Sequence, residues 1–281
     1  MKVLVAGCGD LGTEAGLRLQ RDGHTVVGLR RTPARLPDGF ERLAGDLGGE
    51  LPPLPADTDA VVFAAAPGER SVAAYRRVYR DGLARVLAGL RAAGAAPARV
   101  LFVSSTAVYG VDDGSWVDED TPTEPTSATG QVLVETERSL LDGPFPATTF
   151  RLAGVYGPGR TRLIDQVRSG TATIPAAPAH TNRIHRDDAA EAIVHLLTRV
   201  PAPARVYLGV DHAPVERGEV LRWLAEQLGC PAPPVGADRR SRGGDKCCRN
   251  DRLVATGFRF TYPTYREGYT AVLAGAGTRH P

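Results

Sequence analysis

The chain has 281 residues, of which 42% are apolar and 23% are charged, and its formal net charge at pH 7 is +2. This composition excludes a disordered, collagen-like or coiled-coil chain, and the near-balance of acidic and basic residues argues against nucleic acid as a partner. No apolar run approaches the ~20 residues of a membrane-spanning helix, and the apolar stretch at the N-terminus is too short for a signal peptide. We therefore expect a cytoplasmic protein without a membrane partner.

Short apolar runs alternate with helix-length segments through the first half of the chain. Strands are expected at 3–6, 25–29, 59–66, 99–104 and 147–152, and helices at 11–22, 69–93 and 128–141. Apolar residues three to four positions apart indicate the helices, and apolar runs that end at glycine or proline indicate buried parallel strands. Strands separated by helices predict right-handed βαβ units, and therefore an α/β fold of the Rossmann type with a doubly wound parallel sheet.

Beyond residue 153 the pattern becomes shorter and is broken by glycine and proline. One helix and one strand within 183–210 still fit the parallel sheet, whereas 231–244 has the composition of a loop. We expect residues 1–153 to form a dinucleotide-binding domain, with 183–210 returning to it. Residues 154–281 are expected to form a smaller substrate-binding lobe.

Two residue types limit the possible chemistry. Lys2 and Lys246 are the only lysines, so almost every basic residue is an arginine. The four cysteines fit neither the spacing of a zinc site nor a disulfide framework. We therefore expect free thiols and no metal site.

The first predicted strand runs into the motif Gly7-Cys8-Gly9-Asp10-Leu11-Gly12, which opens the first predicted helix. This is G-x-G-x-x-G in the strand–turn–helix context that indicates a dinucleotide-binding site. Gly7 permits the tight turn, Gly9 lets the backbone approach a pyrophosphate, and Gly12 lets the helix pack closely on the strand. Free N–H groups and the positive dipole around Asp10 and Leu11 favour the bound anion.

The end of the second predicted strand indicates which dinucleotide binds. NAD-dependent enzymes carry an acidic residue ~20 residues after the glycine turn, where it binds the ribose 2′-hydroxyl. This chain has Arg30 and Arg31 at that strand end. Because a guanidinium matches phosphate in geometry and charge, the two arginines predict NADP as the cofactor, with NAD as the less favoured alternative.

Further motifs follow in a fixed order along the chain. They are Gly45-Asp46-Leu47, Ala64-Ala65-Ala66, Val103-Ser104-Ser105-Thr106-Ala107-Val108-Tyr109-Gly110, Phe150-Arg151-Leu152-Ala153-Gly154-Val155-Tyr156-Gly157-Pro158-Gly159 and Ile184-His185-Arg186-Asp187-Asp188. With the glycine turn they resemble the extended short-chain dehydrogenase/reductases of the NAD-dependent epimerase/dehydratase type, especially their atypical bacterial branch. The resemblance covers most of the chain and implies a possible homodimer through the helices at 69–93 and 128–141.

The resemblance also implies roles for individual residues. Those implied to contact the cofactor are Asp46, Leu47, Ala64, Ala65, Ala66, Ser104 and Tyr156. Asp46 belongs to the turn that contacts the adenine, and Tyr156 to the segment behind the nicotinamide. Ser105 occupies the position of the family's catalytic Ser/Thr, where it would hydrogen-bond a substrate carbonyl.

The family's proton relay is missing from this sequence. Its Tyr-x-x-x-Lys pair places both side chains on one helix face, where the lysine cation lowers the tyrosine pKa. By register from Pro125, Thr129 replaces the tyrosine and Leu133 replaces the lysine, and none of the eight tyrosines has a lysine four residues later. The candidate proton donors that remain are Thr129, Tyr109, His185, Tyr156 and Lys246.

These features predict an NADP-binding oxidoreductase or epimerase-like enzyme that acts on a small molecule without the usual Tyr/Lys relay. Loss of both relay residues leaves a second hypothesis, a non-catalytic NADP-binding sensor or regulatory protein. A third is a redox-neutral isomerase or lyase. The acidic segment at 111–124 is expected to be a solvated loop, with an amine-bearing substrate as the alternative.

Overall fold

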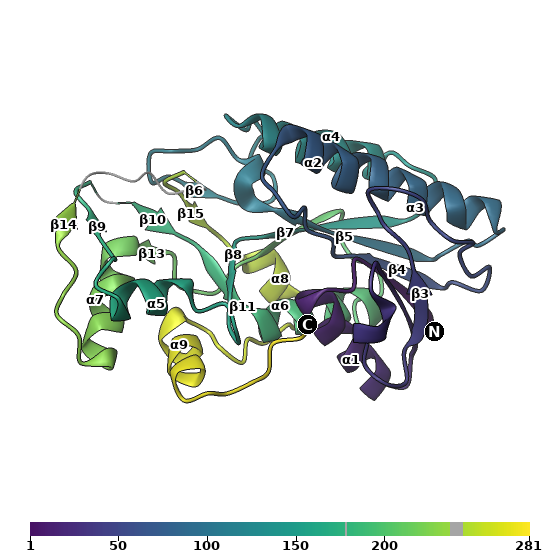
Figure 1. The fold of residues 1–281 in the computed structure, drawn as a ribbon. Coiled ribbons are helices and arrows are strands. Elements are labelled where there is room, and N and C mark those ends of the chain that lie inside the picture. Colours follow the sequence, from purple (N-terminus) through teal and green to yellow (C-terminus); the bar gives the residue numbers. More distant parts are fainter. Residues whose placement is uncertain (178, 237–243) are drawn as a thin grey trace.

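The computed structural model describes residues 1–177, 179–236 and 244–281. Its centre is a seven-stranded parallel sheet with the strand order β12-β7-β5-β4-β1-β2-β3 (Figure 1). The strands are β1 (Lys2–Ala6), β2 (Thr25–Arg30), β3 (Glu41–Ala44), β4 (Ala60–Phe63), β5 (Arg99–Ser105), β7 (Ala147–Leu152) and β12 (Val206–Gly209). The predicted doubly wound Rossmann-type sheet is thereby confirmed.

Helices cover both faces of this sheet. They are α1 (Asp10–Arg21), α2 (Val72–Tyr75), α3 (Asp81–Ala92), α4 (Ala128–Leu141) and α6 (Arg186–Thr198). The helices α1 and α6 pack together on one face, whereas α2, α3 and α4 lie on the other (Figure 1). Within the part of the chain that the structure describes, no helix is long and apolar enough to cross a membrane.

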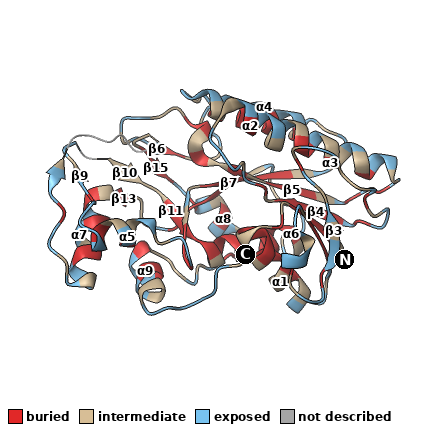
Figure 2. Cartoon of the chain, viewed as in Figure 1, coloured by how far each residue is buried: buried red, intermediate tan, exposed pale blue. Residues whose placement is uncertain are grey.

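The central strands are apolar on both sides because both faces of the sheet are covered (Figure 2). In β1, Val3 and Val5 belong to the core beneath α1 and α6. Leu4 and Ala6 belong to the core beneath α3 and α4. Successive side chains of a strand point to opposite faces, so an uninterrupted apolar run is what a doubly covered strand requires.

Most of the other described elements form a smaller lobe beside the sheet (Figure 1). Its strands form short pairs: β8 (Gly154–Tyr156) with β11 (Arg183–His185), β9 (Ile174–Pro175) with β14 (Val235–Gly236), and β10 (His180–Thr181) with β13 (Val215–Glu216). Its helices are α5 (Arg162–Arg168), α7 (Arg217–Leu228) and α9 (Tyr265–Leu273). A separate apolar core, including Ile164, Leu221 and Tyr269, holds these helices together.

The chain passes more than once between the sheet and the smaller lobe. Strand β12 and helix α6 both belong to the sheet layers. Farther along, β15 (Cys247–Cys248) pairs with β6 (Trp116–Val117), and Leu253 of α8 (Asp251–Ala255) enters the core beneath α1 and α6. The proposed division into domains at residue 153 stays a prediction.

Some element boundaries differ from those predicted. The helix predicted at 69–93 starts only at Val72, because the Ser71 hydroxyl caps it by accepting the Ala74 N–H at 3.1 Å. A π-helical turn at Arg76–Arg80 then separates α2 from α3. Strand β3 was not predicted, because its four residues are largely exposed at the sheet edge and lack an apolar run.

The predicted loop at 231–244 is only partly a loop. Its residues Val235–Gly236 form β14, which pairs with β9. Residues 237–243 of this segment lie outside the described residues.

The C-terminal residues return to the first helix of the sheet (Figure 1). The backbone N–H of His280 donates to Oδ1 of Asp10 at 3.1 Å, and its ring nitrogen Nε2 lies 2.8 Å from Oε2 of Glu14. Nη2 of Arg186 donates to the carbonyl of Thr278 at 2.9 Å. These contacts place the C-terminal segment beside the glycine turn.

Candidate cofactor and substrate site

A cavity of about 1940 Å³ opens at the carboxyl ends of the central strands. Its wall includes Gly7 after β1, Ala64 after β4, Ser105 at the end of β5 and Leu152 at the end of β7. The chain winds in opposite directions on the two sides of the β1–β4 pair, and doubly wound sheets bind their ligands at such a switch point. The cavity exceeds the ~300–1,000 Å³ of ordinary ligand pockets, so a dinucleotide and a second molecule fit together.

The glycine turn has the geometry of an anion site. Gly7 has φ +82°, and a Cβ there would lie 2.5 Å from the Ala65 backbone, so only glycine fits. A Cβ added at Gly9 would meet nothing within 4 Å, which leaves open space above the turn. Among the described residues, no hydrogen-bond partner satisfies the backbone N–H groups of Asp10 and Leu11 at the start of α1. Such free donors are what a helix N-terminus offers to a pyrophosphate.

Three arginines surround the end of the cavity next to β2. Arg30, Arg31 and Arg35 all line it, the last of which the sequence analysis did not single out. Nη1 of Arg30 donates to the carbonyl of Pro281 at 2.9 Å, so the C-terminal segment contacts this end. Asp46 lines the same region, and its Oδ1 accepts the Gly48 N–H at 2.9 Å.

The cavity brings together most of the residues singled out from the sequence. Those that line it are Gly7, Gly9, Asp10, Leu11, Arg30, Arg31, Asp46, Leu47, Ala64, Ala65, Ala66, Ser104, Ser105 and Tyr156. Four others, Gly12, Tyr109, Thr129 and His185, are not among its lining residues. At Gly12 an added Cβ would lie 3.0 Å from the Gly7 carbonyl oxygen and 3.1 Å from Val5, which reflects the close packing of α1 on β1.

Ser104 and Ser105 end β5 and point in different directions. Ser104 Oγ donates to Oε1 of Glu137 at 2.5 Å, which ties the strand to α4. Ser105 Oγ accepts the Ala107 N–H at 3.2 Å. Its own O–H therefore stays available as a donor within the cavity.

Tyr109 is part of a buried network beneath the cavity wall. Its hydroxyl accepts from Nη1 of Arg151 at 2.7 Å and donates to the carbonyl of Asp118 at 2.7 Å. Burial raises the pKa of Tyr109 well above the ordinary value, although Arg151 opposes the shift. The hydroxyl proton is thus held by the fold, and the phenol does not reach the cavity.

Two more of the proton-donor candidates, Thr129 and His185, also lie outside the cavity wall. Thr129, near the start of α4, is half-buried, and its hydroxyl donates over 3.4 Å to Ser127. Burial lowers the pKa of His185 to about 4, so its ring is neutral at physiological pH. The Asp187 N–H donates to Nδ1 at 3.2 Å, whereas Nε2 is buried with no partner among the described residues.

Lys246 does line the cavity, but it is 1% exposed. Its Nζ donates to the Tyr109 carbonyl at 3.4 Å, and burial lowers its pKa. Tyr156 lines the cavity as well, and its hydroxyl donates to the carbonyl of Thr264 over 3.4 Å.

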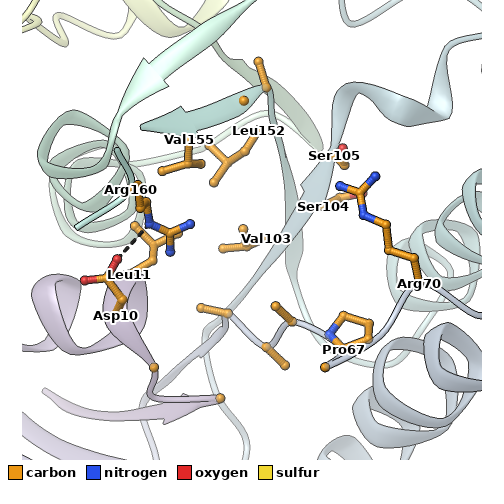
Figure 3. Close-up of a pocket in the computed structure, with 18 of the residues that line it drawn as sticks. Asp10, Leu11, Pro67, Arg70, Val103, Ser104, Ser105, Leu152, Val155 and Arg160 are labelled. Atoms are coloured by element: carbon orange, nitrogen blue, oxygen red, sulfur yellow. Dashed lines mark hydrogen bonds and ion pairs between the residues drawn. The ribbon is translucent and has the colours of Figure 1, made fainter. Parts of the chain in front are cut away.

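The sequence analysis missed further cations around the cavity. They are Arg70, Arg77, Arg160, Arg162, Arg183 and Arg217. Figure 3 shows Arg160 reaching Asp10 from one side and Arg70 projecting from the other, and Nε of Arg160 donates to Oδ2 of Asp10 at 2.8 Å. Burial is the largest single effect on Asp10 and raises its pKa, but the hydrogen bonds from Arg160 and His280 and the charges of Arg160 and Arg186 together lower the pKa below its ordinary value. In an arginine-rich chain no local signal distinguishes these side chains.

A doubly wound sheet with an open glycine turn and a large cavity at its switch point defines a dinucleotide-binding protein of the oxidoreductase class. A model of the NAD dependent epimerase/dehydratase family matches residues 3–209. The match spans most of the chain, and the chain therefore belongs to that family. The resemblance stated from the sequence is thereby confirmed. The chain is an NAD(P)-dependent, epimerase/dehydratase-like protein.

Similar solved structures agree with this assignment. A Methylobacillus flagellatus protein, provisionally described as an NAD-dependent epimerase/dehydratase, is 37% identical, with a TM-score of 0.80 and 98% of each chain covered. A conserved protein of unknown function from Silicibacter pomeroyi DSS is 32% identical, with a TM-score of 0.78 and 99% of each chain covered. MoeE5 in complex with UDP-glucose and NAD is 26% identical, with a TM-score of 0.77 and 96% of each chain covered. No curated protein matches at a significant level.

Proposed function

We propose that the protein is an NADP-dependent oxidoreductase of the epimerase/dehydratase type that acts on a small molecule held beside the cofactor. The observation that carries the proposal is one continuous cavity. It joins the open glycine turn, the arginines after β2 and Ser105.

The residues present fit a dinucleotide phosphate. The space over Gly9 and the free N–H groups at the start of α1 suit the pyrophosphate. Arg30, Arg31 and Arg35 would hold a 2′-phosphate, for which Arg30 would exchange its contact with Pro281. Asp46 and Leu47 would lie by the adenine. When bound, the nicotinamide supplies hydride acceptance or donation.

The cofactor proposed here, NADP, differs from the NAD found in a similar solved structure. MoeE5 was solved with NAD and UDP-glucose. The strand end of β2 in this chain has arginine where an NAD site requires a carboxylate, and two further guanidinium groups do not help a neutral ribose hydroxyl. The cationic end of the cavity therefore supports NADP.

The chain's own chemistry starts at Ser105. Its hydroxyl donates to the oxygen of a substrate carbonyl and polarises the carbon that receives hydride. Tyr109 cannot take part, because Arg151 and Asp118 already use its hydroxyl. Thr129 does not line the cavity, and its hydroxyl is far less acidic than a phenol. Proton transfer through water in the cavity is the route that these positions support.

A test of the proposed reaction is hydride transfer itself. The protein is incubated with 4-deuterated NADPH and a panel of small aldehydes and ketones, and the products are examined by mass spectrometry. Deuterium in a product, lost in Ser105→Ala while NADPH binding is unchanged, supports the proposal. Turnover that is unaffected in Ser105→Ala contradicts the role of Ser105.

The second candidate is a protein that binds NADP as a sensor without turnover. The replacement of both relay residues, by Thr129 and Leu133, favours it. It predicts NADPH binding with no deuterium transfer to any carbonyl. The third candidate, a redox-neutral isomerase or lyase, predicts reduced cofactor that is formed and consumed within one turnover starting from NADP⁺.

A further inference from the structure

One wall of the cavity carries a histidine–aspartate pair that the sequence analysis did not single out. His180 of β10 lines the cavity, and among the described residues it is the only histidine that does so. Its ring nitrogen Nδ1 lies 2.9 Å from Oδ1 of Asp245. The two residues are 65 positions apart, so no local sequence pattern reveals the pair.

The backbone of His180 fixes the geometry of this pair. Its N–H donates to the same Oδ1 of Asp245 at 2.7 Å, so this oxygen contacts both the ring and the main chain of the histidine. Strand β10 is itself paired with β13, with His180 opposite Glu216. Because a carboxylate only accepts hydrogen bonds, Nδ1 carries a hydrogen and donates it to Asp245.

Asp245 is held in place by the acidic segment at 111–124. The Asp245 N–H donates to Oδ1 of Asp112 at 2.8 Å, and the Asp245 carbonyl accepts the Gly114 N–H at 3.0 Å. A Cβ added at Gly114 would lie 3.5 Å from Nδ1 of His180 and 3.7 Å from Oδ2 of Asp245. The backbone at Gly114 therefore packs directly against the pair, and the carboxylate is held from two chain segments.

The second ring nitrogen of His180, Nε2, is available to the cavity. No described residue forms a hydrogen bond with it. The side chain is 32% exposed, so water in the cavity can reach this nitrogen. With Nδ1 bonded to Asp245, Nε2 is the atom that can take up or release a proton.

The pair lies beside the chain segment that follows Ser105. Lys246 is the residue next to Asp245, and its Nζ donates to the Tyr109 carbonyl at 3.4 Å. Tyr109 follows a single turn of 3-10 helix that begins directly after Ser105. Since Ser105 and His180 both line the cavity, a substrate oxygen bound by Ser105 would share one space with the imidazole.

Other titratable side chains of the cavity wall are less suited to proton transfer. Burial raises the pKa of each of three phenols that line the cavity, Tyr79, Tyr156 and Tyr269. Lys246 is only 1% exposed. Histidine is the side chain that gains and loses a proton most readily near neutral pH, and in His180 that chemistry stands in the cavity wall.

We propose that His180, oriented by Asp245, is the general acid–base group of the cavity and takes the place of the missing Tyr/Lys relay. His180 exchanges a proton with the substrate oxygen through the cavity water, and Asp245 is a positioning residue. The inference rests on the proposed function, because it concerns the proton that accompanies hydride transfer. It names the group that supplies this proton.

The step balances as a carbonyl reduction. The carbonyl carbon receives hydride, with its two electrons, from NADPH. The electron pair of the C=O π bond moves onto the oxygen, which Ser105 holds and which takes a proton from water. That water takes the proton on Nε2 of the imidazolium of His180, and the neutral ring is protonated again from solvent. NADPH, the carbonyl compound and one proton thus give NADP⁺ and an alcohol, and oxidation follows the reverse order.

The first test uses the deuterium-transfer assay with the full chain, 4-deuterated NADPH and the aldehyde or ketone of the panel that gives most product. His180→Gln is expected to lower the rate at least about a hundredfold, as loss of a general acid requires, while NADPH binding is unchanged. Added imidazole should restore part of the rate in His180→Ala and none in Ser105→Ala. The matched control is His24→Gln, a half-buried histidine outside the cavity, and it should react like the wild type.

The second test needs neither cofactor nor substrate. Nitrogen-15 NMR of histidine-labelled protein shows which ring nitrogen carries the hydrogen, and the His180 signal is the one lost in His180→Gln. We expect the hydrogen of the neutral ring on Nδ1 in the wild type. Asp245→Asn should lose this preference and lower the rate of deuterium transfer, while the backbone N–H of His180 keeps an oxygen acceptor. A hydrogen on Nε2 in the neutral wild-type ring overturns the proposed pair.

Failure of this inference is distinct from failure of the proposed function. A wild type that transfers no deuterium to any carbonyl overturns the proposed reaction, and the acid–base role of His180 with it. If the wild type is active and His180→Gln is as active as His24→Gln, only the role of His180 is overturned. A slow His180→Ala variant that imidazole does not restore shows a structural role and also overturns the proposal.

Discussion

Arg151 and Glu137 form a buried ion pair at the carboxyl end of strand β5. Nη2 of Arg151 lies 2.7 Å from Oε2 of Glu137, and Nε contacts both carboxylate oxygens at 3.1 and 3.2 Å. Glu137 also accepts from Ser104, and Arg151 also donates to Tyr109. The pair therefore joins α4, β5 and β7 directly behind Ser105.

Breaking this pair should be costly. Glu137→Ala leaves Arg151 buried and unpaired, and we expect it to lower the free energy of unfolding by about 3–5 kcal/mol. Urea denaturation measures the change. The control is Asp81→Ala, which removes the exposed pair with Arg80 and should cost under about 1 kcal/mol. Equal losses in the two variants would contradict the structural role of the buried pair.

Two substitutions in the glycine turn should have different effects, one on cofactor binding and the other on stability. Gly9→Ala adds a methyl group in open space, so stability should change by less than about 1 kcal/mol while NADPH binding falls. Gly7→Ala adds a Cβ against the Ala65 backbone at a positive φ, and should lower stability by at least about 1–2 kcal/mol. Thermal unfolding and NADPH fluorescence measure the two effects. A Gly9→Ala variant that binds NADPH normally would place the pyrophosphate elsewhere.

Asp211 should make stability depend on pH. Its pKa is about 7 in the folded state against an ordinary 3.8, so the folded state holds the proton more tightly. The resulting stabilisation is complete below the ordinary pKa and is lost as pH rises through about 7. Asp211→Asn should therefore lose less stability than the wild type between pH 5.5 and 8. Urea denaturation at both pH values tests this, with the exposed Asp142→Asn as control, and identical pH dependence in Asp211→Asn and wild type would refute it.

His185 should make stability fall as the pH is lowered, the opposite of the pH dependence expected from Asp211. Its folded pKa is about 4 against an ordinary 6.5, so the unfolded state takes up the proton first. The stability of the neutral buried ring is present above the ordinary pKa and is lost as pH falls toward about 4. His185→Gln should flatten the fall in unfolding free energy between pH 7 and 5. An unchanged slope would show that the ring titrates as it does in the unfolded chain.

The fold could be predicted because its signals are local. The glycine turn and the apolar runs of β1 and β4 are continuous in sequence, and both faces of the sheet are covered. Strand β3 escaped prediction because an exposed edge strand needs no apolar run. The π-helical turn at Arg76–Arg80 cannot be recognised from the 3.6-residue spacing of apolar residues.

The candidate site could be predicted only in part for a similar reason. The cofactor-binding candidates follow strand ends, and parallel strands bring those ends together. Arg183 and Arg217 of the smaller lobe line the same cavity only once this lobe has folded. In a chain so rich in arginine, nothing in the sequence distinguishes these two arginines from the others. Tyr109 was a candidate proton donor, but its hydroxyl accepts a hydrogen bond from Arg151, which is distant in sequence, and lies buried outside the cavity.

The central claim, NADP use through the arginines after β2, is tested most directly by fluorescence titration with NADPH and NADH in parallel. We expect NADPH to bind at least about tenfold more tightly. Arg30→Ala combined with Arg31→Ala should abolish that preference, whereas Arg91→Ala, an exposed arginine on α3 outside the cavity, should retain it. Equal affinity for the two cofactors in the wild type, or a preference that survives the double substitution, would contradict the claim.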